Sequence, residues 1–188
     1  RHRSVSRGLG DVYKRQMHVF AFLSEKKAAG LVKQIGFSFH DTVYVLDGIL
    51  TEHPEVDFVQ IQLNYLDWEN DTIQSRKCYE TAKKHGKPVI VMEPVKGGTL
   101  ANIPQEAENL FRTYHPNLSV ASWAIRFAAS HENVMLVLSG MSTLEQVKDN
   151  LSYMENFTPF TEEEYGLVQK AADIINGSIA VPCTGCAY

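Results

Sequence analysis

The sequence predicts an α/β fold built on a parallel sheet, and three features of the chain support this. Apolar runs typical of strands alternate four times with helical patterns. Each run is continuously apolar, which is typical of a parallel sheet covered on both faces. Polar residues follow the C-terminal end of each run, at Ser38 and His40, 60–64, 93–96 and 140–142. A doubly wound sheet and a (β/α)₈ barrel both fit, and neither GxGxxG nor GxxxxGK[ST] is present to favour the open sheet.

The first sixteen residues are excluded from the fold. Residues 11–16, DVYKRQ, are what the mosaic end of a transposon adapter encodes, and residues 1–10 have no apolar periodicity. We therefore interpret 1–16 as a non-native segment. The native sequence is expected to start near Met17, within an element, so that the chain is a fragment.

The first half of the native segment predicts three helices and two strands. Glycine is expected to end the first helix, and an acidic or hydroxyl side chain to cap the second. The predicted elements are a helix at Val19–Ala29 with Gly30 after it, a strand at Val32–Phe37, a helix from a cap at Asp41 or Thr42 through Leu50, a strand at Phe58–Leu63 and a helix at Asp71–His85.

The second half repeats the alternation. Gly86-Lys87-Pro88 separates it from the first half, and Gly97-Gly98 marks a loop after the third strand. The predicted elements are a strand at Val89–Met92, helices at 104–114 and Leu118–Ser130, a strand at Val134–Ser139, a helix at Leu144–Met154, and a last helix from Thr161 to about Gly177.

The segment Leu136–Leu151, LVLSGMSTLEQVKDNL, combines a strand, a glycine turn and a helix start. Gly140 allows close approach of a ligand to the backbone, and the helix N-terminus favours an anion there. Ser142 and Glu145 fit an S-x-x-E capping box. An ordinary strand-to-helix junction gives the same local pattern, so the rest of the chain has to decide between the two.

Composition excludes several classes of function. The 188 residues are 44% hydrophobic and 21% charged, enough for one globular domain. A net charge of −4 argues against nucleic-acid binding. No apolar run reaches the ~20 residues of a membrane span and no signal peptide is recognised, so we expect a cytoplasmic protein without a membrane partner.

Four motifs in order resemble the fifth to eighth strand–loop segments of the aldo-keto reductases: IGFSFHD, VQIQLNYLD, PVIVMEPVKGG and LSGMSTLEQVKDNL. The resemblance implies that residues 17–176 form the C-terminal half of a TIM barrel with its terminal helix. Half a barrel cannot close, so its two outer strands would keep unpaired backbone groups.

The resemblance also implies a nicotinamide site for reducing a carbonyl or oxidising an alcohol of a small-molecule substrate. Ser38 and Gln60 stand where the family holds the nicotinamide carboxamide, although Phe39 replaces the usual asparagine. Met92 stands where many members stack an aromatic ring. His40 is interpreted either as a substrate contact or as a structural or exposed histidine.

The adenosine end of the dinucleotide is assigned in the same way. Pro94 and Lys96 follow in the loop near the pyrophosphate, and the resemblance places Gly140, Met141 and Ser142 at the 2′-phosphate or ribose and Gln146, Asp149 and Asn150 at adenine. Many NADPH-selective members carry a lysine and an arginine at the positions of Gly140 and Gln146. Without them, the sequence leaves NADP(H) and NAD(H) open.

The catalytic groups are expected upstream of this chain. The family's tyrosine acid, with its aspartate, lysine and histidine, belongs to the first four units, so no catalytic residue is assigned in this chain and the isolated chain is expected to be inactive. The alternative is a redox-silent nucleotide-binding regulatory subunit on the same scaffold. The upstream half discriminates between the two, because the enzyme reading fails if that half lacks the tyrosine and the lysine. A third reading is an incomplete product without a stable fold.

The C-terminal cysteines extend the resemblance to a bacterial subgroup with a ferredoxin-like [4Fe–4S] extension. Cys183 and Cys186 fit the first two positions of C-x₂-C-x₂-C-x₃-C-P, and the third would follow Tyr188. Residues 177–188 are therefore interpreted as the start of an iron–sulfur segment, complete only in the full-length protein and serving an electron-transfer partner. A zinc half-site and a redox dithiol are the other readings of CxxC. Cys78 is expected to be a small core residue.

Overall fold

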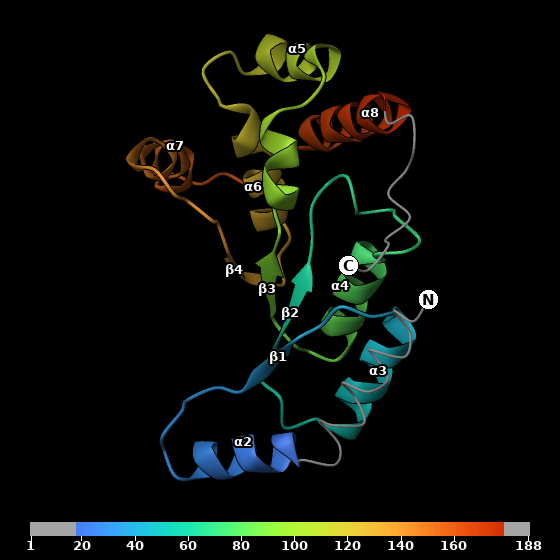
Figure 1. The fold of residues 1–188 in the computed structure, drawn as a ribbon, viewed down its shortest axis with the longest axis vertical. Coiled ribbons are helices and arrows are strands. Elements are labelled where there is room, and N and C mark those ends of the chain that lie inside the picture. The colour runs from blue at the N-terminus through green and yellow to red at the C-terminus, as the bar shows by residue number, and fades with distance from the viewer. Residues whose placement is uncertain (1–17, 179–188) are drawn as a thin grey trace.

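The chain folds around one four-stranded sheet in which every neighbouring pair is parallel, in the order β1-β2-β3-β4 (Figure 1). The structure is a computed structural model that describes residues 18–178. The strands are β1 (Gly36–Ser38), β2 (Phe58–Gln62), β3 (Val89–Met92) and β4 (Val134–Val137). The helices are α2 (Val19–Ala28), α3 (Val43–Glu52), α4 (Ser75–Lys84), the 3₁₀ helix η1 (Lys96–Ala101), α5 (Gln105–Tyr114), α6 (Val120–Ala129), α7 (Leu144–Met154) and α8 (Glu162–Ser178).

Each predicted element is present, and the largest differences lie at boundaries. β1 starts at Gly36, where pairing with Phe58 begins, and not at Val32. α4 starts at Ser75 because the Asn70 side chain accepts hydrogen bonds from the backbone of residues 72 and 73, which turns that segment before the helix.

Helix α2 has the predicted end but is not part of the core. Gly30 ends it as expected, with φ 73° and a hydrogen bond from its amide to the Lys27 carbonyl. However, α2 has no buried residue. Phe20 makes its aromatic contacts, stacking on His53 with ring centroids 3.9 Å apart and meeting Phe37 edge-on. The apolar residues of α2 are spread around the helix axis, so no single apolar face is available for burial.

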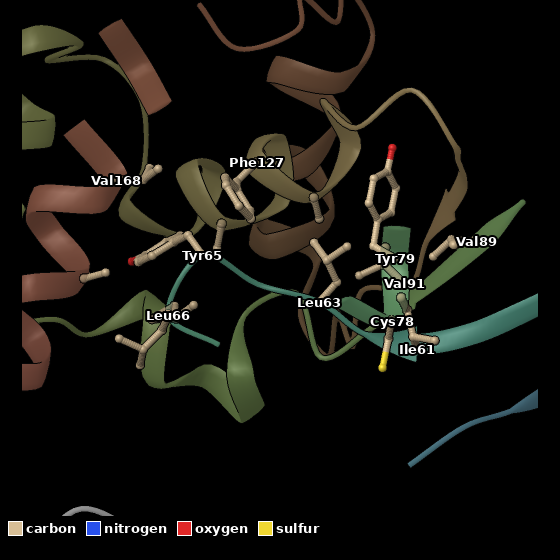
Figure 2. Close-up of a cluster of buried hydrophobic side chains, with 14 of the residues drawn as sticks. Ile61, Leu63, Tyr65, Leu66, Cys78, Tyr79, Val89, Val91, Phe127 and Val168 are labelled. Atoms are coloured by element: carbon tan, nitrogen blue, oxygen red, sulfur yellow. The ribbon is translucent and has the colours of Figure 1, made fainter. Parts of the chain in front are cut away.

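The sheet is buried on one face, whereas the sequence predicts cover on both. Val59 and Ile61 of β2 are buried, but the alternating Gln60 and Gln62 are half-buried. Figure 2 shows Ile61 with Val89 and Val91 of β3 and side chains of α4 in one apolar cluster. The opposite face would be the interior of a barrel, which four strands do not enclose.

Aromatic side chains form the core between the helices. Trp123 of α6 stacks on Phe111 of α5 with ring centroids 4.3 Å apart, and both are buried. Cys78 is 3% exposed, as predicted for a core residue, and burial raises the pKa of its thiol to about 11. The thiolate form is therefore disfavoured at neutral pH.

A buried ion pair joins α6 to α8. Arg126 donates to Glu164 at 2.7 Å, and Glu164 is 3% exposed. Glu164 also completes a capping box with Thr161, whose hydroxyl accepts from the Glu164 amide at 3.2 Å while the carboxylate accepts from the Thr161 amide at 2.9 Å. The predicted start of the last helix at Thr161 is confirmed.

The two outer strands leave the sheet open in the described residues, as the prediction of half a barrel requires. β4 pairs with β3 alone, and its Met135 and Leu136 are 48% and 49% exposed. In Figure 1, α3 and α4 lie to the right of the sheet, and α7 lies to its left beyond β4. The chain is thus an open α/β unit with four parallel strands.

We predict that His131 makes the free energy of unfolding depend on pH. Its ring stacks on Trp68 with centroids 4.4 Å apart, its Nε2 is buried without a hydrogen-bond partner, and burial lowers its pKa to about 4. Because the unfolded histidine has a pKa near 6.5, the unfolded state binds the proton first as pH falls. The contribution of the neutral ring to the free energy of unfolding is therefore fully present above pH ~6.5. It falls by about 3 kcal/mol as the pH is lowered to ~4.

Denaturant unfolding of the wild-type chain and His131→Phe between pH 7 and pH 4 measures this effect. Phenylalanine keeps the stacking on Trp68 and removes the titration. Between pH 7 and pH 4 the wild-type chain should lose about 3 kcal/mol more of its free energy of unfolding than the variant does. Parallel pH profiles for the two proteins would show that the His131 ring is not held neutral.

Candidate functional site

Three of the predicted site residues meet near the C-terminal ends of β1, β2 and β3. Ser38 of β1 is in register with Gln60 of β2, and Met92 lies at the end of β3. Gln60 Nε2 lies 3.5 Å from Ser38 Oγ and 3.4 Å from Met92 Sδ, and Ser38 Oγ lies 3.7 Å from the same sulfur. Parallel pairing brings these residues together although 54 positions separate the first from the last.

The cluster is able to hold a planar amide. Ser38 is exposed and Gln60 is half-buried, so a hydroxyl and a carboxamide are presented side by side next to a thioether. His40 is exposed, and its Nε2 lies 3.0 Å from Ser38 Oγ. Phe39 is 6% exposed and belongs to the core, so this position, where the resemblance expected an asparagine, faces away from the cluster.

A cleft with a volume of about 510 Å³ lies between the loop after β3 and the segment after β4. It brings together six of the predicted site residues: Pro94, Gly140, Met141, Gln146, Asp149 and Asn150. Their separation in sequence is bridged by the β3–β4 pairing, with Val91 opposite Val137. Lining residues that the sequence analysis did not assign include Glu93, Gly97, Gly98 and Ser139.

The α7 cap differs from the predicted one by one position. Thr143 is the N-cap, its hydroxyl accepts from the Gln146 amide at 3.3 Å, and the Gln146 side chain accepts from the Thr143 amide at 3.2 Å. Gln146 Oε1 also accepts from the Ser142 amide at 2.7 Å. The predicted box of Ser142 with Glu145 is therefore wrong, because Thr143 is the residue in the extended conformation that precedes the helix.

The far end of the cleft is held by side-chain hydrogen bonds. Asp149 accepts from Ser119 Oγ at 2.6 Å, and Asn150 donates to Ser139 Oγ at 2.9 Å. The Tyr153 hydroxyl donates to the side-chain oxygen of Asn150, Oδ1. These bonds fix the positions of two predicted adenine contacts relative to α6 and β4.

The charged residues that line the cleft, Glu93 and Asp149, are both acidic. The favourable field for an anion comes instead from the N-terminus of α7, where Gly140, Met141 and Ser142 precede the first turn. All three are exposed. The cleft can therefore present polar backbone and side-chain groups to a ligand, with a helix dipole at one end.

Lys96 lies in the predicted loop, but its side chain is directed away from the cleft lining. Its Nζ contacts both carboxylate oxygens of Asp67, at 2.6 and 2.7 Å. Asp67 is 2% exposed and also accepts from Gln62 at 2.8 Å and from Asn64 at 2.9 Å. Sequence reasoning missed this buried network; its visible signal is two polar residues, Asn64 and Asp67, directly after a buried strand.

The cysteine pair cannot be placed, because Cys183 and Cys186 lie outside the described residues 18–178. Within that range, no three His, Cys, Asp or Glu side chains are grouped to hold a metal ion. None of the helices in the same range is long and apolar enough to span a membrane.

Comparison with known proteins gives a family and a fold. The sequence model of the aldo/keto reductase family matches residues 10–173, a range that begins within the segment interpreted as non-native. No curated protein matches the chain.

Solved structures of aldo-keto reductases share the fold. An aldo-keto reductase from Bacillus halodurans in its holo form is 24% identical with a TM-score of 0.62, covering 79% of this chain and 53% of that one. A thermostable aldo-keto reductase in complex with the inhibitor epalrestat is 18% identical with a TM-score of 0.64, covering 81% and 53%. Aldose reductase from Giardia lamblia is 14% identical with a TM-score of 0.58, covering 80% and 48%. The chain therefore spans about half the length of these structures.

We predict that Thr143, and not Ser142, stabilises the start of α7. Thr143→Ala removes the hydroxyl that caps the Gln146 amide and should lower the free energy of unfolding by about 1 kcal/mol. Ser142→Ala is the matched control and should cost less than half as much: it removes one exposed bond, from the Ser142 hydroxyl to Gln146 Oε1 at 3.2 Å, but keeps the amide bond to the same oxygen at 2.7 Å. Denaturant unfolding measures both, and equal losses would argue against the observed cap.

Proposed function

Because the chain belongs to the aldo/keto reductase family, we propose that it carries the dinucleotide-binding half of an NAD(P)H-dependent oxidoreductase. The full-length enzyme would reduce a carbonyl, or oxidise an alcohol, of a small-molecule substrate. One observation carries the proposal: a single cleft gathers six residues that the sequence assigns to the dinucleotide, from two strand–loop segments.

The residues fit the two ends of a dinucleotide. Ser38 and Gln60 would hold the nicotinamide carboxamide, and the Met92 thioether would pack against the nicotinamide ring. Gly140, Met141 and Ser142 at the α7 N-terminus would face the adenosine ribose or its 2′-phosphate. Gln146, Asp149 and Asn150 would border adenine, and Pro94 and Lys96 belong to the loop near the pyrophosphate.

A bound nicotinamide dinucleotide would supply the hydride, and the residues of this chain would bind and orient it. We assign no catalytic residue to residues 17–176, which we propose to be the C-terminal half of the barrel. The proton donor would come from the other half, because the family's acid and its partners precede the segments matched here. The proposal for this chain is therefore a binding role within a larger enzyme.

The C-terminal residues 177–188 are proposed to begin a [4Fe–4S] segment of the full-length protein. The support is the CxxC spacing of Cys183 and Cys186 alone. Two thiolates do not complete a cluster, so an electron-transfer partner would meet only the longer protein. Iron and sulfide content of that protein, with Cys183→Ala and Cys186→Ala, tests this part: unchanged content in both variants would contradict it.

We predict that NADPH or NADH raises the unfolding temperature of the chain and that filling the cleft at Gly140 abolishes the shift. A ligand at one hundred times its Kd adds about 2.7 kcal/mol to the free energy of unfolding. A Cβ at Gly140 meets no atom within 4 Å, and its φ lies outside the left-handed region, so Gly140→Leu places a side chain in the cleft without strain.

The control is Gly166→Ala on α8, also in open space and remote from the cleft. Gly140→Leu should keep its own unfolding temperature and lose the nucleotide shift, and Gly166→Ala should keep the shift. A cooperative transition would exclude the reading of an unfolded product. Absence of any shift for the wild-type chain would contradict dinucleotide binding by this half.

A further inference from the structure

We propose that Asp67, assisted by Asn64, is a positioning residue that holds the loop 93–98 in the shape that forms one wall of the cleft. Neither residue lines the cleft. The inference rests on the proposed dinucleotide site and adds to it a means by which that site keeps its form.

The loop has an unusual backbone. Glu93 and Lys96 have φ values of 54° and 49°, and Gly97 and Gly98 have values of 60° and 93°. Glycine enters the left-handed region freely, but other residues do so uncommonly. Such conformations persist where the surrounding structure determines them, so the contacts of Glu93 and Lys96 need an explanation.

Asn64 holds Glu93, the first of these two residues. Its Nδ2 donates to the Glu93 carbonyl at 3.2 Å, and the Lys96 amide donates to the same carbonyl at 3.0 Å. Asn64 is fully buried, and its own Oδ1 accepts from the Asp67 amide at 2.9 Å. The turn at 64–67 is therefore rigidly bonded both to itself and to the start of the loop.

Asp67 holds Lys96, the second of the two non-glycine residues in the left-handed region. Both of its oxygens contact Lys96 Nζ, and Gln62 and Asn64 donate to one of them. Asp67 is 2% exposed, whereas the Lys96 side chain is 31% exposed. A carboxylate buried to this extent is costly without its cation, so it retains Lys96 strongly and with it the left-handed backbone at that position.

The consequence for the cleft is a division of roles along the loop. Lys96 points back to Asp67, while Glu93, Pro94, Val95, Gly97 and Gly98 line the cleft. A Cβ at Gly97 or Gly98 would meet no atom within 4 Å, so the two glycines leave open space beside the cleft wall. The Lys96 charge acts as an anchor of the loop, and the ligand meets the loop backbone.

In the alternative role, Lys96 binds a phosphate of the ligand directly. The variant Asp67→Asn distinguishes this role from anchoring of the loop. Removing the carboxylate charge would free the cation and tighten NADPH binding if Lys96 met the phosphate. If Asp67 positions the loop, the same change weakens binding. The expected result is at least a tenfold rise in the Kd for NADPH, measured by its fluorescence with the full 188-residue chain.

Hydrogen exchange of the unliganded chain provides a readout that needs no ligand. The amides of Gly98 and Leu100 both donate to the Val95 carbonyl, at 3.1 Å, and report on the loop. Asp67→Asn should speed exchange at both at least tenfold, and Lys96→Met should do the same. Lys96→Arg, which can keep the carboxylate bond, should retain slow exchange and the wild-type Kd. If Asp67→Asn does not fold, exchange in Lys96→Met decides.

Asp71→Asn is the matched control. It makes the same change in net charge at a carboxylate that is 96% exposed and pairs with Lys77 at 3.3 Å, and it should alter neither measurement. Tighter NADPH binding by Asp67→Asn, or unchanged loop exchange in Asp67→Asn and Lys96→Met, would overturn the positioning role. If the wild-type chain binds neither NADPH nor NADH, the proposed function fails, while the exchange result still decides the role of Asp67.

Discussion

Parallel pairing of the four strands is the constraint on which the rest of the structure depends. It places the C-terminal end of every strand at the same edge of the sheet, so each following loop contributes to one region. Ser38 and Gln60 meet because they are register partners, and Met92 reaches them from the neighbouring strand β3. The cleft forms because β3 and β4 are neighbours. The helices stabilise the arrangement by burying one face of the sheet, but the strands determine which residues become neighbours.

The order and type of the elements could be predicted because their signals are local. Apolar runs, the glycine after α2 and the threonine before α8 each act within a few residues. Burial could not be predicted as well, since the pattern of β2 depends on which helices cover each face. The α7 cap shows the same limit: both Ser142 with Glu145 and Thr143 with Gln146 fit the capping pattern, and the path of the chain out of β4 decides between them.

The sequence predicted which residues lie at the site better than it predicted which groups those residues contact. Six residues assigned to the dinucleotide line one cleft, because the pairing of β3 with β4 brings the segments after the two strands together. Lys96 illustrates why contacts were predicted less well: its residue type suggests a cation available to a phosphate, but a carboxylate 29 positions earlier occupies it. A buried polar network is invisible to periodicity, because its members are related by the tertiary fold and not by spacing.

The exposed edge at β4 offers a surface for association between molecules. Met135 and Leu136 leave apolar surface beside backbone groups that pair on one side in the described residues. An edge of this kind is a template for another strand, so association between molecules is expected as protein concentration rises. A dilution series therefore separates two properties of the chain. A Kd for NADPH that changes with protein concentration would indicate pairing of β4 edges between molecules, and a constant Kd would indicate that the proposed site acts independently of association.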